Sequence, residues 1–203
     1  MIPQWTPKGV LPPNNHNTPT SRDRSPYRAS ITDFILRYAT SAARNTILQG
    51  FLSFRKALNN IGLDQGFQWV DGSFVEHVES IQNRDPHDVD VVTFFYSRHG
   101  ETQADLLSRG PDLFDPRMTK MKYHVDAHFV ELTESVFEPL ANQTTLVSQA
   151  AYWYSVWSHT REEQWKGYLQ LDLSLIDDLV AQANLDQSVQ ASLDDVASCG
   201  GEL

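Results

Sequence analysis

Apolar side chains recur every three or four residues over residues 31–58, the spacing that places them on one side of a helix. Ser30 stands three residues before Asp33, as in a helix N-cap, and residues 59–62 contain the asparagines and the glycine that commonly end a helix. The pattern therefore predicts a long helix with room for one break.

Three later segments are short and rich in β-branched and aromatic residues, which is typical of strands. They cover residues 67–70, 89–96 and 123–130. Apolar and polar residues alternate in the third segment, and successive side chains of a strand point to opposite faces. The apolar set is therefore expected to face the core, and the opposite face is expected to carry His124, Asp126 and His128.

The remaining pattern predicts further helices and one more strand. Residues 101–121 are interrupted by two prolines and are expected to form a helical or looped insertion between two strands. Beyond the third strand, we expect a helix ending near Trp157, an edge strand over residues 165–171 and a final helix over residues 174–184.

The chain divides into three parts. Residues 1–28 hold six of the ten prolines and are predicted to form an irregular arm that packs across the body. Residues 29–185 are expected to make up the folded domain, and residues 186–203 an acidic, flexible tail. The mixture of helices and strands indicates an α/β (α+β) domain with a small mixed sheet flanked by helices.

Composition and charge limit the classes of function that the protein can have. Of the 203 residues, 40% are hydrophobic and 11% aromatic, which is enough to bury a core. The 16 Lys and Arg residues against 26 Asp and Glu residues give a net charge of −10. Proteins that coat nucleic acid bind phosphates through clustered Lys and Arg, so this balance argues against nucleic acid as the main partner, although it leaves a local basic patch open.

Cysteine usage and hydropathy suggest a location. Cys199 is the single cysteine, which excludes an intrachain disulfide and a cysteine-based metal cluster. No segment approaches the roughly 18 consecutive apolar residues of a membrane span, and the first residues lack the pattern of a secretory signal. We therefore expect a cytoplasmic protein with no membrane partner.

The most informative motif begins where the strand of residues 67–70 runs into Gly72 and Ser73. Glycine allows the backbone to approach a phosphate closely, and the serine hydroxyl with nearby amides can bind that phosphate. After a short helix, Asp88 and Asp90 open the next strand. Residues two apart on a strand face the same side, and two such carboxylates repel each other unless a cation lies between them. Mg²⁺ (or Mn²⁺) fits a pair of carboxylates together with substrate phosphates.

Asp126 is the candidate third acid, because it lies on the polar face of the third strand. Asp115 and Glu131 compete for this role, since the choice of Asp126 depends on alternation alone. Two metal ions held by three acids can activate a hydroxyl nucleophile and stabilise a leaving pyrophosphate. The candidate catalytic and metal-binding residues are Asp88, Asp90 and Asp126, and the candidate nucleotide-binding residues are Gly72 and Ser73.

Together these residues resemble the DNA polymerase β-type nucleotidyltransferase superfamily. The likeness covers about residues 67–130 and consists of a strand, Gly72-Ser73, a helix, two acids on one strand and Asp126 on another. The 14 residues between Ser73 and Asp88 slightly exceed the gap usual in that superfamily. The resemblance implies that the Gly-Ser pair holds a nucleoside triphosphate (NTP), that the acids bind metal ions, and that the third acid helps to deprotonate the acceptor.

A wider resemblance suggests a biological setting. Residues 9–13, 71–75 and 165–169 are similar to segments of bacterial minimal-nucleotidyltransferase-like proteins, including those of toxin–antitoxin and phage-defence systems. The implied reaction moves a nucleoside monophosphate from an NTP to a hydroxyl group. The acceptor stays open between a protein side chain, a tRNA end and a small molecule.

Two other interpretations are open. His87 and Asp88, with His124 and His128, could be the ligands of a metal phosphohydrolase, although such pairs normally lie on helices. Alternatively, a catalytically inactive nucleotidyltransferase-like module could serve as an antitoxin or assembly subunit. Such a module would bind a protein partner and would need neither metal nor nucleotide.

Several charged and aromatic residues have simpler explanations. The aromatic residues within 152–157 are expected in the core or on a partner surface rather than stacking on bases. Arg161 and Lys166 form the best local basic cluster, for which a polar turn at the end of a helix is the default. Arg55 is expected on a solvated helix face and Asp178 among surface acids.

Overall fold

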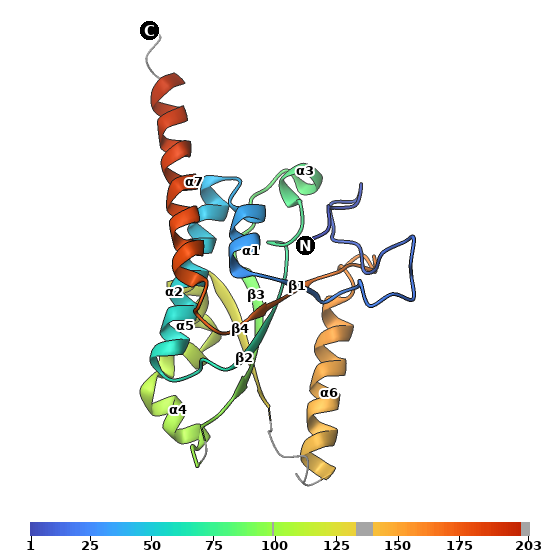
Figure 1. Ribbon diagram of the computed structural model, residues 1–203, viewed down its shortest axis with the longest axis vertical. Coiled ribbons are helices and arrows are strands. Elements are labelled where there is room, and N and C mark those ends of the chain that lie inside the picture. Colours follow the sequence, from blue (N-terminus) through green and yellow to red (C-terminus); the bar gives the residue numbers. More distant parts are fainter. Residues whose placement is uncertain (99, 133–139, 200–203) are drawn as a thin grey trace.

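The computed structural model describes residues 1–98, 100–132 and 140–199 and, for residues 140–143 and 192–199, the backbone alone. It contains a mixed five-stranded sheet with helices on both faces (Figure 1). The α/β (α+β) class and the small mixed sheet predicted from the pattern are therefore confirmed. None of the helices in the described ranges combines the length and the apolar character needed to cross a membrane.

The order of the strands across the sheet is β1-β5-β2-β3-β4. β1 runs parallel to β5 and β3 runs parallel to β4, whereas β2 is antiparallel to both of its neighbours. The strands are β1 (Tyr27–Ala29), β2 (Gly66–Asp71), β3 (Val89–Tyr96), β4 (Val125–Leu132) and β5 (Leu169–Asp172). The three most apolar predicted strands thus become the adjacent strands β2, β3 and β4.

The parallel pairing of β3 and β4 requires a crossover, which is the insertion predicted over residues 101–121. It contains α4 (Gln103–Arg109), the 3-10 helix η1 (Pro111–Phe114) and α5 (Pro116–Tyr123). α5 ends at His124, whose φ of 55° is the left-handed conformation common at helix ends. The third strand therefore begins at Val125, and the expectation that His124 shares a strand face with Asp126 is wrong.

One face of the sheet carries the main core beneath α1 (Ile31–Tyr38), α2 (Ala42–Asn60) and α7 (Asp178–Cys199). The long helix predicted from the apolar spacing is present with one break. Ser30 caps α1 and Ser41 caps α2, and each hydroxyl accepts a hydrogen bond from the backbone N–H three residues later. The predicted capping serine of the first helix is confirmed, and the second explains where the break falls.

α7 is longer and better anchored than the sequence pattern indicated. Residues 186–199, expected to be flexible, continue the helix that begins at Asp178. Arg55 is not on a solvated face: it is fully buried, and its Nε lies 2.8 Å from a carboxylate oxygen of Asp178. Asp178 is correspondingly not a free surface acid, because the Arg55 guanidinium satisfies it. Helical spacing could not distinguish a buried ion pair from two solvated charges.

The opposite face of the sheet is partly covered by α6 (Leu140–Trp157), which stands apart from the other helices (Figure 1). A second apolar cluster lies beneath it and includes Trp69, Phe94 and Tyr168. Trp157 belongs to this cluster, whereas the side chains of Tyr152 and Tyr154 are exposed. The aromatic segment of α6 therefore contributes both to the core and to the surface.

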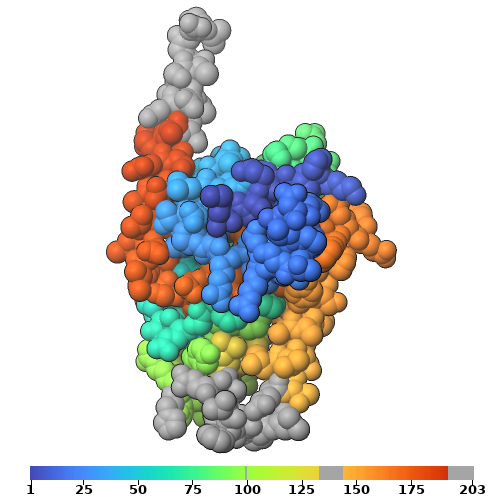
Figure 2. Space-filling view, turned by 45° about the vertical axis from the view of Figure 1, so that its right-hand side comes forward, coloured from blue at the N-terminus to red at the C-terminus, as the bar shows by residue number. Residues whose placement is uncertain are grey.

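The N-terminal arm packs across the body, as its apolar residues predicted (Figure 2). Its dark blue atoms lie between the lighter blue of α1 and the orange of α6 in this view. Ile2, Val10 and Leu11 are buried, and the Leu11 carbonyl accepts a hydrogen bond from the Gly167 N–H at 2.8 Å. The arm thus connects the beginning of the chain to the segment just before β5.

Candidate functional site

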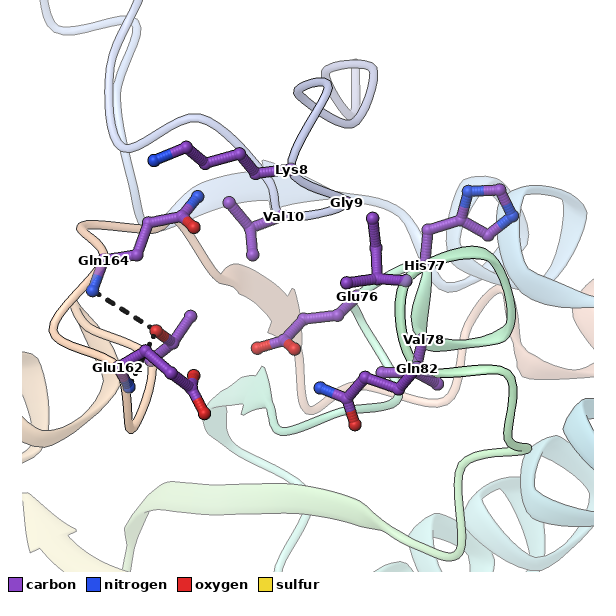
Figure 3. Close-up of a pocket in the computed structure, with 11 residues that line it drawn as sticks. Lys8, Gly9, Val10, Glu76, His77, Val78, Gln82, Glu162 and Gln164 are labelled. Atoms are coloured by element: carbon purple, nitrogen blue, oxygen red, sulfur yellow. Dashed lines mark hydrogen bonds between the residues drawn. The ribbon is translucent and has the colours of Figure 1, made fainter.

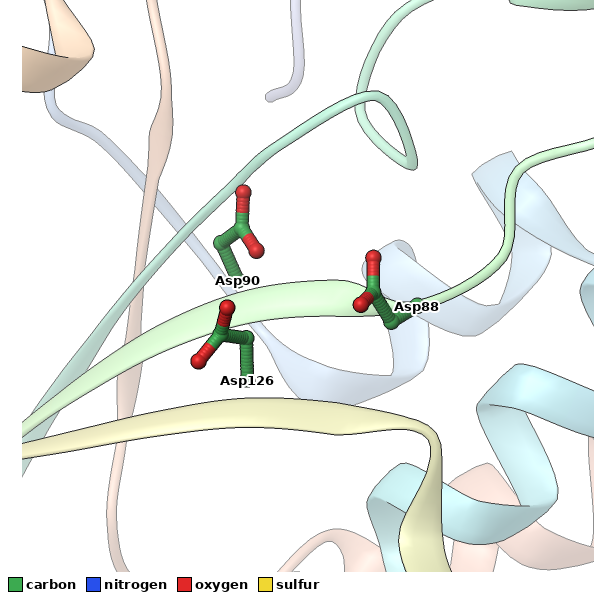
Figure 4. A group of neighbouring side chains, drawn as sticks. All are labelled: Asp88, Asp90 and Asp126. Atoms are coloured by element: carbon green, nitrogen blue, oxygen red, sulfur yellow. The ribbon is translucent and has the colours of Figure 1, made fainter. Parts of the chain in front are cut away.

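Three carboxylates converge on the sheet face that α6 partly covers (Figure 4). Asp90 lies on β3, Asp88 directly precedes that strand, and Asp126 lies on β4. Asp90 and Asp126 are register partners in the parallel ladder, so their side chains lie beside each other on one face. One oxygen from each of the three residues lies within 4.8 Å of the others. The structure thus brings together the three acids singled out in the sequence.

The strand alternation explains why these acids are accessible. Val89 and Val91, on either side of Asp90, are buried in the main core, and Val125 and Ala127 flank Asp126 in the same way. The polar members of both strands must therefore point to the opposite face. The side chains of Asp88 and Asp126 are 29% and 25% exposed. Solvent and ligands can consequently reach this face of the sheet.

Lys120 of α5 bridges two of the acids. Its Nζ lies 3.1 Å from an oxygen of Asp88 and 2.8 Å from an oxygen of Asp126. The hydrogen bond to Asp126 is the largest influence on Lys120 and, together with Asp88, raises the pKa of its ammonium. Lys120 is therefore the cation that balances the clustered carboxylates, and nothing in the sequence pattern had singled it out.

Asp90 is partly buried, like the other two acids. Burial raises the pKa of its carboxyl to about 6, and the neighbouring charges of Asp88 and Asp126 act in the same direction. Such repulsion indicates that the site holds more negative charge than Lys120 balances. A further cation would relieve this excess.

Gly72 lies directly against Asp90. Its φ of +85° is in the left-handed region, and a Cβ at this position would lie 2.5 Å from Asp90 Oδ2. Both the backbone conformation and the contact therefore require glycine. Ser73 follows in a turn in which the Ser73 carbonyl accepts a hydrogen bond from the Glu76 N–H. Within the described part of the chain, the Ser73 hydroxyl makes no hydrogen bond.

The loop of residues 72–77, here called the Gly72 loop, is held from two sides. Arg44 of α2 is fully buried and donates hydrogen bonds to the carbonyls of Phe74 and Glu76 at 2.6 and 2.7 Å. From the arm, Trp5 Nε1 donates to the Val75 carbonyl at 2.7 Å. Fixed carbonyls leave little freedom to the loop backbone, so its position relative to the acids is set in advance of ligand binding.

A buried charge cluster supports the other side of the loop. Lys166 Nζ lies 3.0 Å from Asp71 and 2.8 Å from Glu76, and its side chain is only 5% exposed. Burial raises the pKa of Asp71 to about 7, against the attraction of Lys166. Asp71 is also the antiparallel register partner of Asp90, so the cluster lies next to the three acids.

The Lys166 cluster was missed in the sequence. The interpretation of Lys166 as part of a local basic cluster with Arg161 is wrong, because Lys166 is buried between Asp71 and Glu76. The position of Asp71 at the end of a core strand could have indicated a buried ion pair, because a buried acid needs a counter-ion. The partner itself comes from a segment 95 residues away and could not be identified from spacing.

His128 connects the acids to α6. Its Nε2 lies 3.5 Å from Asp126 Oδ1, and its ring lies 4.5 Å from that of Trp153, centroid to centroid. The strand alternation correctly placed His128 on the face of Asp126. The Trp153 side chain of α6 is thus linked to the carboxylate cluster through His128.

A hollow of about 530 Å³ lies beside the Gly72 loop (Figure 3). It is lined by Lys8, Gly9 and Val10 of the arm, by Glu76, His77 and three residues of α3 (Val78–Gln82), namely Val78, Ile81 and Gln82, and by Thr160, Glu162 and Gln164 after α6. The side chains of Glu76 and Glu162 point into it (Figure 3). Because Glu76 also binds Lys166, the hollow is linked to the acid cluster through Lys166 and Asp71.

The competing candidates lie elsewhere. Asp115 caps α5 by accepting a hydrogen bond from the Arg117 N–H, and Glu131 accepts one from the Ser97 hydroxyl. His124 is the cap residue of α5. The metal-ligand cluster found in the described part of the chain consists of aspartates alone, which gives no support to a phosphohydrolase with histidine ligands.

The donor set fits a hard divalent cation. Carboxylate oxygens from three residues are close enough to share an ion, and Lys120 already places a cation between two of them. Oxygen ligands of this kind suit Mg²⁺ or Mn²⁺ rather than a metal that prefers sulfur or imidazole. The partial exposure of the acids leaves room for water and phosphate oxygens to complete the coordination.

The comparisons with known proteins give a family but no activity. The model of a family of unknown function, DUF6932, matches residues 3–172. The match includes the arm, all five strands and the acids, and it ends at the last residue of β5. No curated protein and no solved structure matched the chain.

Proposed function

We propose that this chain, which belongs to the DUF6932 family of unknown function, is a metal-dependent nucleotidyltransferase. In this proposal it moves a nucleoside monophosphate from an NTP to a hydroxyl acceptor. The observation that carries the proposal is the convergence of Asp88, Asp90 and Asp126 against the Gly72 loop. The resemblance of the same residues to the DNA polymerase β-type superfamily also supports it.

The Gly72 loop is suited to the phosphate groups of the substrate. Its backbone is held by Arg44 and Trp5, and the Ser73 hydroxyl is available for a ligand. A preformed loop avoids part of the entropic cost of ordering donors around a triphosphate. We assign Gly72 and Ser73 to triphosphate binding and Asp88, Asp90 and Asp126 to holding Mg²⁺ or Mn²⁺.

In the proposed reaction, the oxygen of the acceptor hydroxyl forms a bond to the α-phosphorus of the NTP. The bond between that phosphorus and the oxygen bridging to the β-phosphorus breaks, and pyrophosphate leaves with the bonding electrons. Asp126 takes the hydroxyl proton as general base. The divalent cation, when bound, supplies neutralising charge at the phosphates and at the leaving group.

The lining of the hollow bears on the acceptor. Glu76 and Glu162 face its interior, and Lys8 is the one lysine or arginine among the residues that line it. The charge of Glu162, with that part of the Glu76 charge which Lys166 does not balance, repels a phosphate backbone. This surface therefore favours a neutral or cationic hydroxyl compound, or a protein side chain, over nucleic acid. The net charge of −10 acts in the same direction.

The biological setting depends on the resemblance alone. A cytoplasmic enzyme of a toxin–antitoxin or antiviral defence system is consistent with the similarity to minimal nucleotidyltransferases.

One observation favours a second candidate function. Tyr152 and Val156, four residues apart on one side of α6, are exposed on a helix that stands apart from the other helices, and exposed apolar surfaces of this kind commonly bind proteins. An inactive module acting as an antitoxin or assembly subunit would use this surface. It would need neither the NTP nor the metal.

The Asp126→Asn variant separates the two functions. Transfer is measured with each labelled NTP, Mg²⁺ or Mn²⁺ and a cell lysate, and binding of the same NTP is measured by calorimetry. A general base acts in the transition state, so we expect transfer to fall by about 10²-fold or more while the NTP affinity changes much less. The effect of the protein in cells is compared for the wild type and the same variant. If Asp126→Asn keeps the full cellular effect but shows no transfer, the enzymatic function is contradicted and the binding module is favoured.

A further inference from the structure

Lys120 contacts two of the three aspartates that could hold a metal ion. Its Nζ contacts Asp88 and Asp126 at 3.1 and 2.8 Å, and those are two of the three residues assigned to the cation. Among the described residues, it is the lysine or arginine that forms ion pairs with this cluster. The site therefore cannot accept a divalent cation on the same oxygens unless the ammonium moves.

The two lysines that bridge acid pairs differ in their freedom to move. Lys166 is 5% exposed and is enclosed between Asp71 and Glu76, as expected for a structural ion pair. Lys120 is 46% exposed, and its backbone is fixed near the end of α5 by the hydrogen bond from the His124 N–H to the Lys120 carbonyl. A lysine side chain on a fixed backbone can swing its ammonium over several ångströms at little cost.

The destination of the released ammonium follows from charge. A divalent cation on Asp88 and Asp126 repels the ammonium from these oxygens. The metal would arrive with a triphosphate, whose negative charge then lies at the mouth of the same site. A flexible lysine is a common ligand for phosphate oxygens because it can approach as a mobile point charge.

We propose that Lys120 is an exchangeable counter-ion: it balances the aspartates in the free protein and moves to the triphosphate when the metal binds. This inference rests on the proposed function, because it takes the aspartates as the metal site. It deepens that function by assigning a triphosphate-binding residue from the crossover, outside the Gly72 loop and the three acids. It also implies that a metal ion that binds without nucleotide must displace the Lys120 ammonium from the aspartates.

The test uses Lys120→Met and the matched control Lys122→Met in the full chain. Lys122 lies on the same helix, has a similar exposure of 42%, and pairs with Asp112 rather than with the three acids. The first measurement is the affinity for Mn²⁺ without nucleotide. Calorimetry and the electron paramagnetic resonance signal of free Mn²⁺ both determine it. The second is the affinity for a non-hydrolysable α,β-methylene NTP analogue at saturating Mn²⁺.

We expect opposite changes from one substitution. Lys120→Met should bind Mn²⁺ on the order of tenfold more tightly, because a unit charge a few ångströms from the site has been removed. The same variant should bind the NTP analogue on the order of tenfold more weakly, because the phosphate has lost its lysine. Lys122→Met should change neither value, and Lys120→Arg, which retains the charge, should keep the Mn²⁺ affinity near that of the wild type.

Other results overturn the inference. If Lys120→Met leaves the Mn²⁺ affinity unchanged, the ammonium does not compete with the metal. If the affinity for the NTP analogue is unchanged at saturating Mn²⁺, Lys120 does not reach the phosphates. Either result leaves the proposed function intact, provided that the wild-type protein binds Mn²⁺ through its aspartates. Failure of the wild-type protein to bind Mn²⁺ at all removes the proposed function itself.

Discussion

At the scale of single residues, the conformation of Gly72 and the position of Asp90 depend on each other. Gly72→Ala places a methyl group 2.5 Å from Asp90 Oδ2 and forces alanine to a φ of +85°. We expect the free energy of unfolding to fall by about 1–3 kcal/mol, from the left-handed backbone and the displaced carboxylate together. The Mn²⁺ affinity should fall as well, because Asp90 must shift. Urea unfolding and calorimetry measure the two effects.

Gly100→Ala is the matched control. Gly100 has a φ of +79°, but a Cβ there would meet nothing within 4 Å. This variant carries the backbone cost alone, so its Mn²⁺ affinity should equal that of the wild type. Equal Mn²⁺ affinities of Gly72→Ala and Gly100→Ala would show that the contact with Asp90 is unimportant.

Asp90 also predicts a pH dependence of stability. Burial and two neighbouring acids raise the pKa of its carboxyl to about 6, whereas in the unfolded chain it titrates near 4. Between these values the native protein holds a proton that the unfolded chain has released. The contribution of Asp90 to the free energy of unfolding is therefore present below pH 4 and is lost as the pH rises to about 6.

The expected behaviour of Asp90→Asn follows from this loss of stability with rising pH. Asparagine does not ionise, so without metal the variant should gain stability relative to the wild type as the pH increases from 4 to 6. Above that range the difference should remain constant. Urea unfolding in the presence of a chelator at several pH values measures it, and parallel curves for the two proteins would refute the assignment of the raised pKa to Asp90.

At the scale of secondary-structure elements, α2 positions the Gly72 loop through Arg44. The guanidinium is buried, pairs with Glu79 and donates to two loop carbonyls. Arg44→Met removes these donors and leaves Glu79 without its partner, so we expect a loss of about 3–5 kcal/mol in the free energy of unfolding. Mn²⁺ and NTP binding should weaken in the fraction that remains folded, because the loop backbone is released.

Lys56→Met is the control for this helix. Lys56 is exposed on α2, and its substitution should change stability by no more than about 0.5 kcal/mol. Chemical denaturation compares the two variants, and hydrogen exchange of the backbone amides of residues 72–77 reports on the loop. Unchanged exchange of these amides in Arg44→Met would mean that other contacts are sufficient to hold the loop.

Elements also show where sequence patterns cease to predict structure. Both Arg44 and Arg55 lie in a helix whose apolar spacing was correctly identified, yet each is buried against acids from distant segments. A charged residue inside a helical pattern looks the same whether its partner is water or a carboxylate. Only the packing of α7 and of the Gly72 loop against α2 distinguishes these cases.

At the scale of the whole molecule, metal binding should be linked to thermal stability. A ligand that binds only the native state at 100 times its Kd stabilises it by about 2.7 kcal/mol. We expect Mn²⁺ to raise the Tm of the wild type by several degrees. The double variant Asp88→Asn with Asp90→Asn should show no such shift, and its Tm without metal should exceed that of the wild type because a like-charge repulsion is lost.

A charge-matched double variant provides the comparison. Asp64→Asn with Asp85→Asn removes the same number of charges from exposed positions that do not belong to the group of three acids. It should retain the Mn²⁺-dependent shift in Tm, measured by calorimetry. If both double variants respond to Mn²⁺ as the wild type does, Asp88 and Asp90 do not bind the metal.

Residue order alone predicted the strands β2, β3 and β4, the helical segments α1 and α2, and the face on which the candidate acids lie, but it did not predict β1. Helical spacing, β-branched runs and strict alternation are local properties, and local backbone geometry converts them directly into helices, strands and strand faces. The convergence of Asp88, Asp90 and Asp126 followed from this logic once β3 and β4 paired in parallel. The pairing itself came from the crossover through α5.

Which charges stabilise the site depends on the packing of distant segments. Lys120 reaches the acids because α5 leads directly into β4, and Lys166 reaches Asp71 because β5 inserts between β1 and β2. Arg44 meets the Gly72 loop for a similar reason, since α2 packs beside it. Such ion pairs join segments that are far apart in the chain, and their energies depend on burial and distance. Burial and distance cannot be inferred from the order of residues. The alternation that exposes the acids can be.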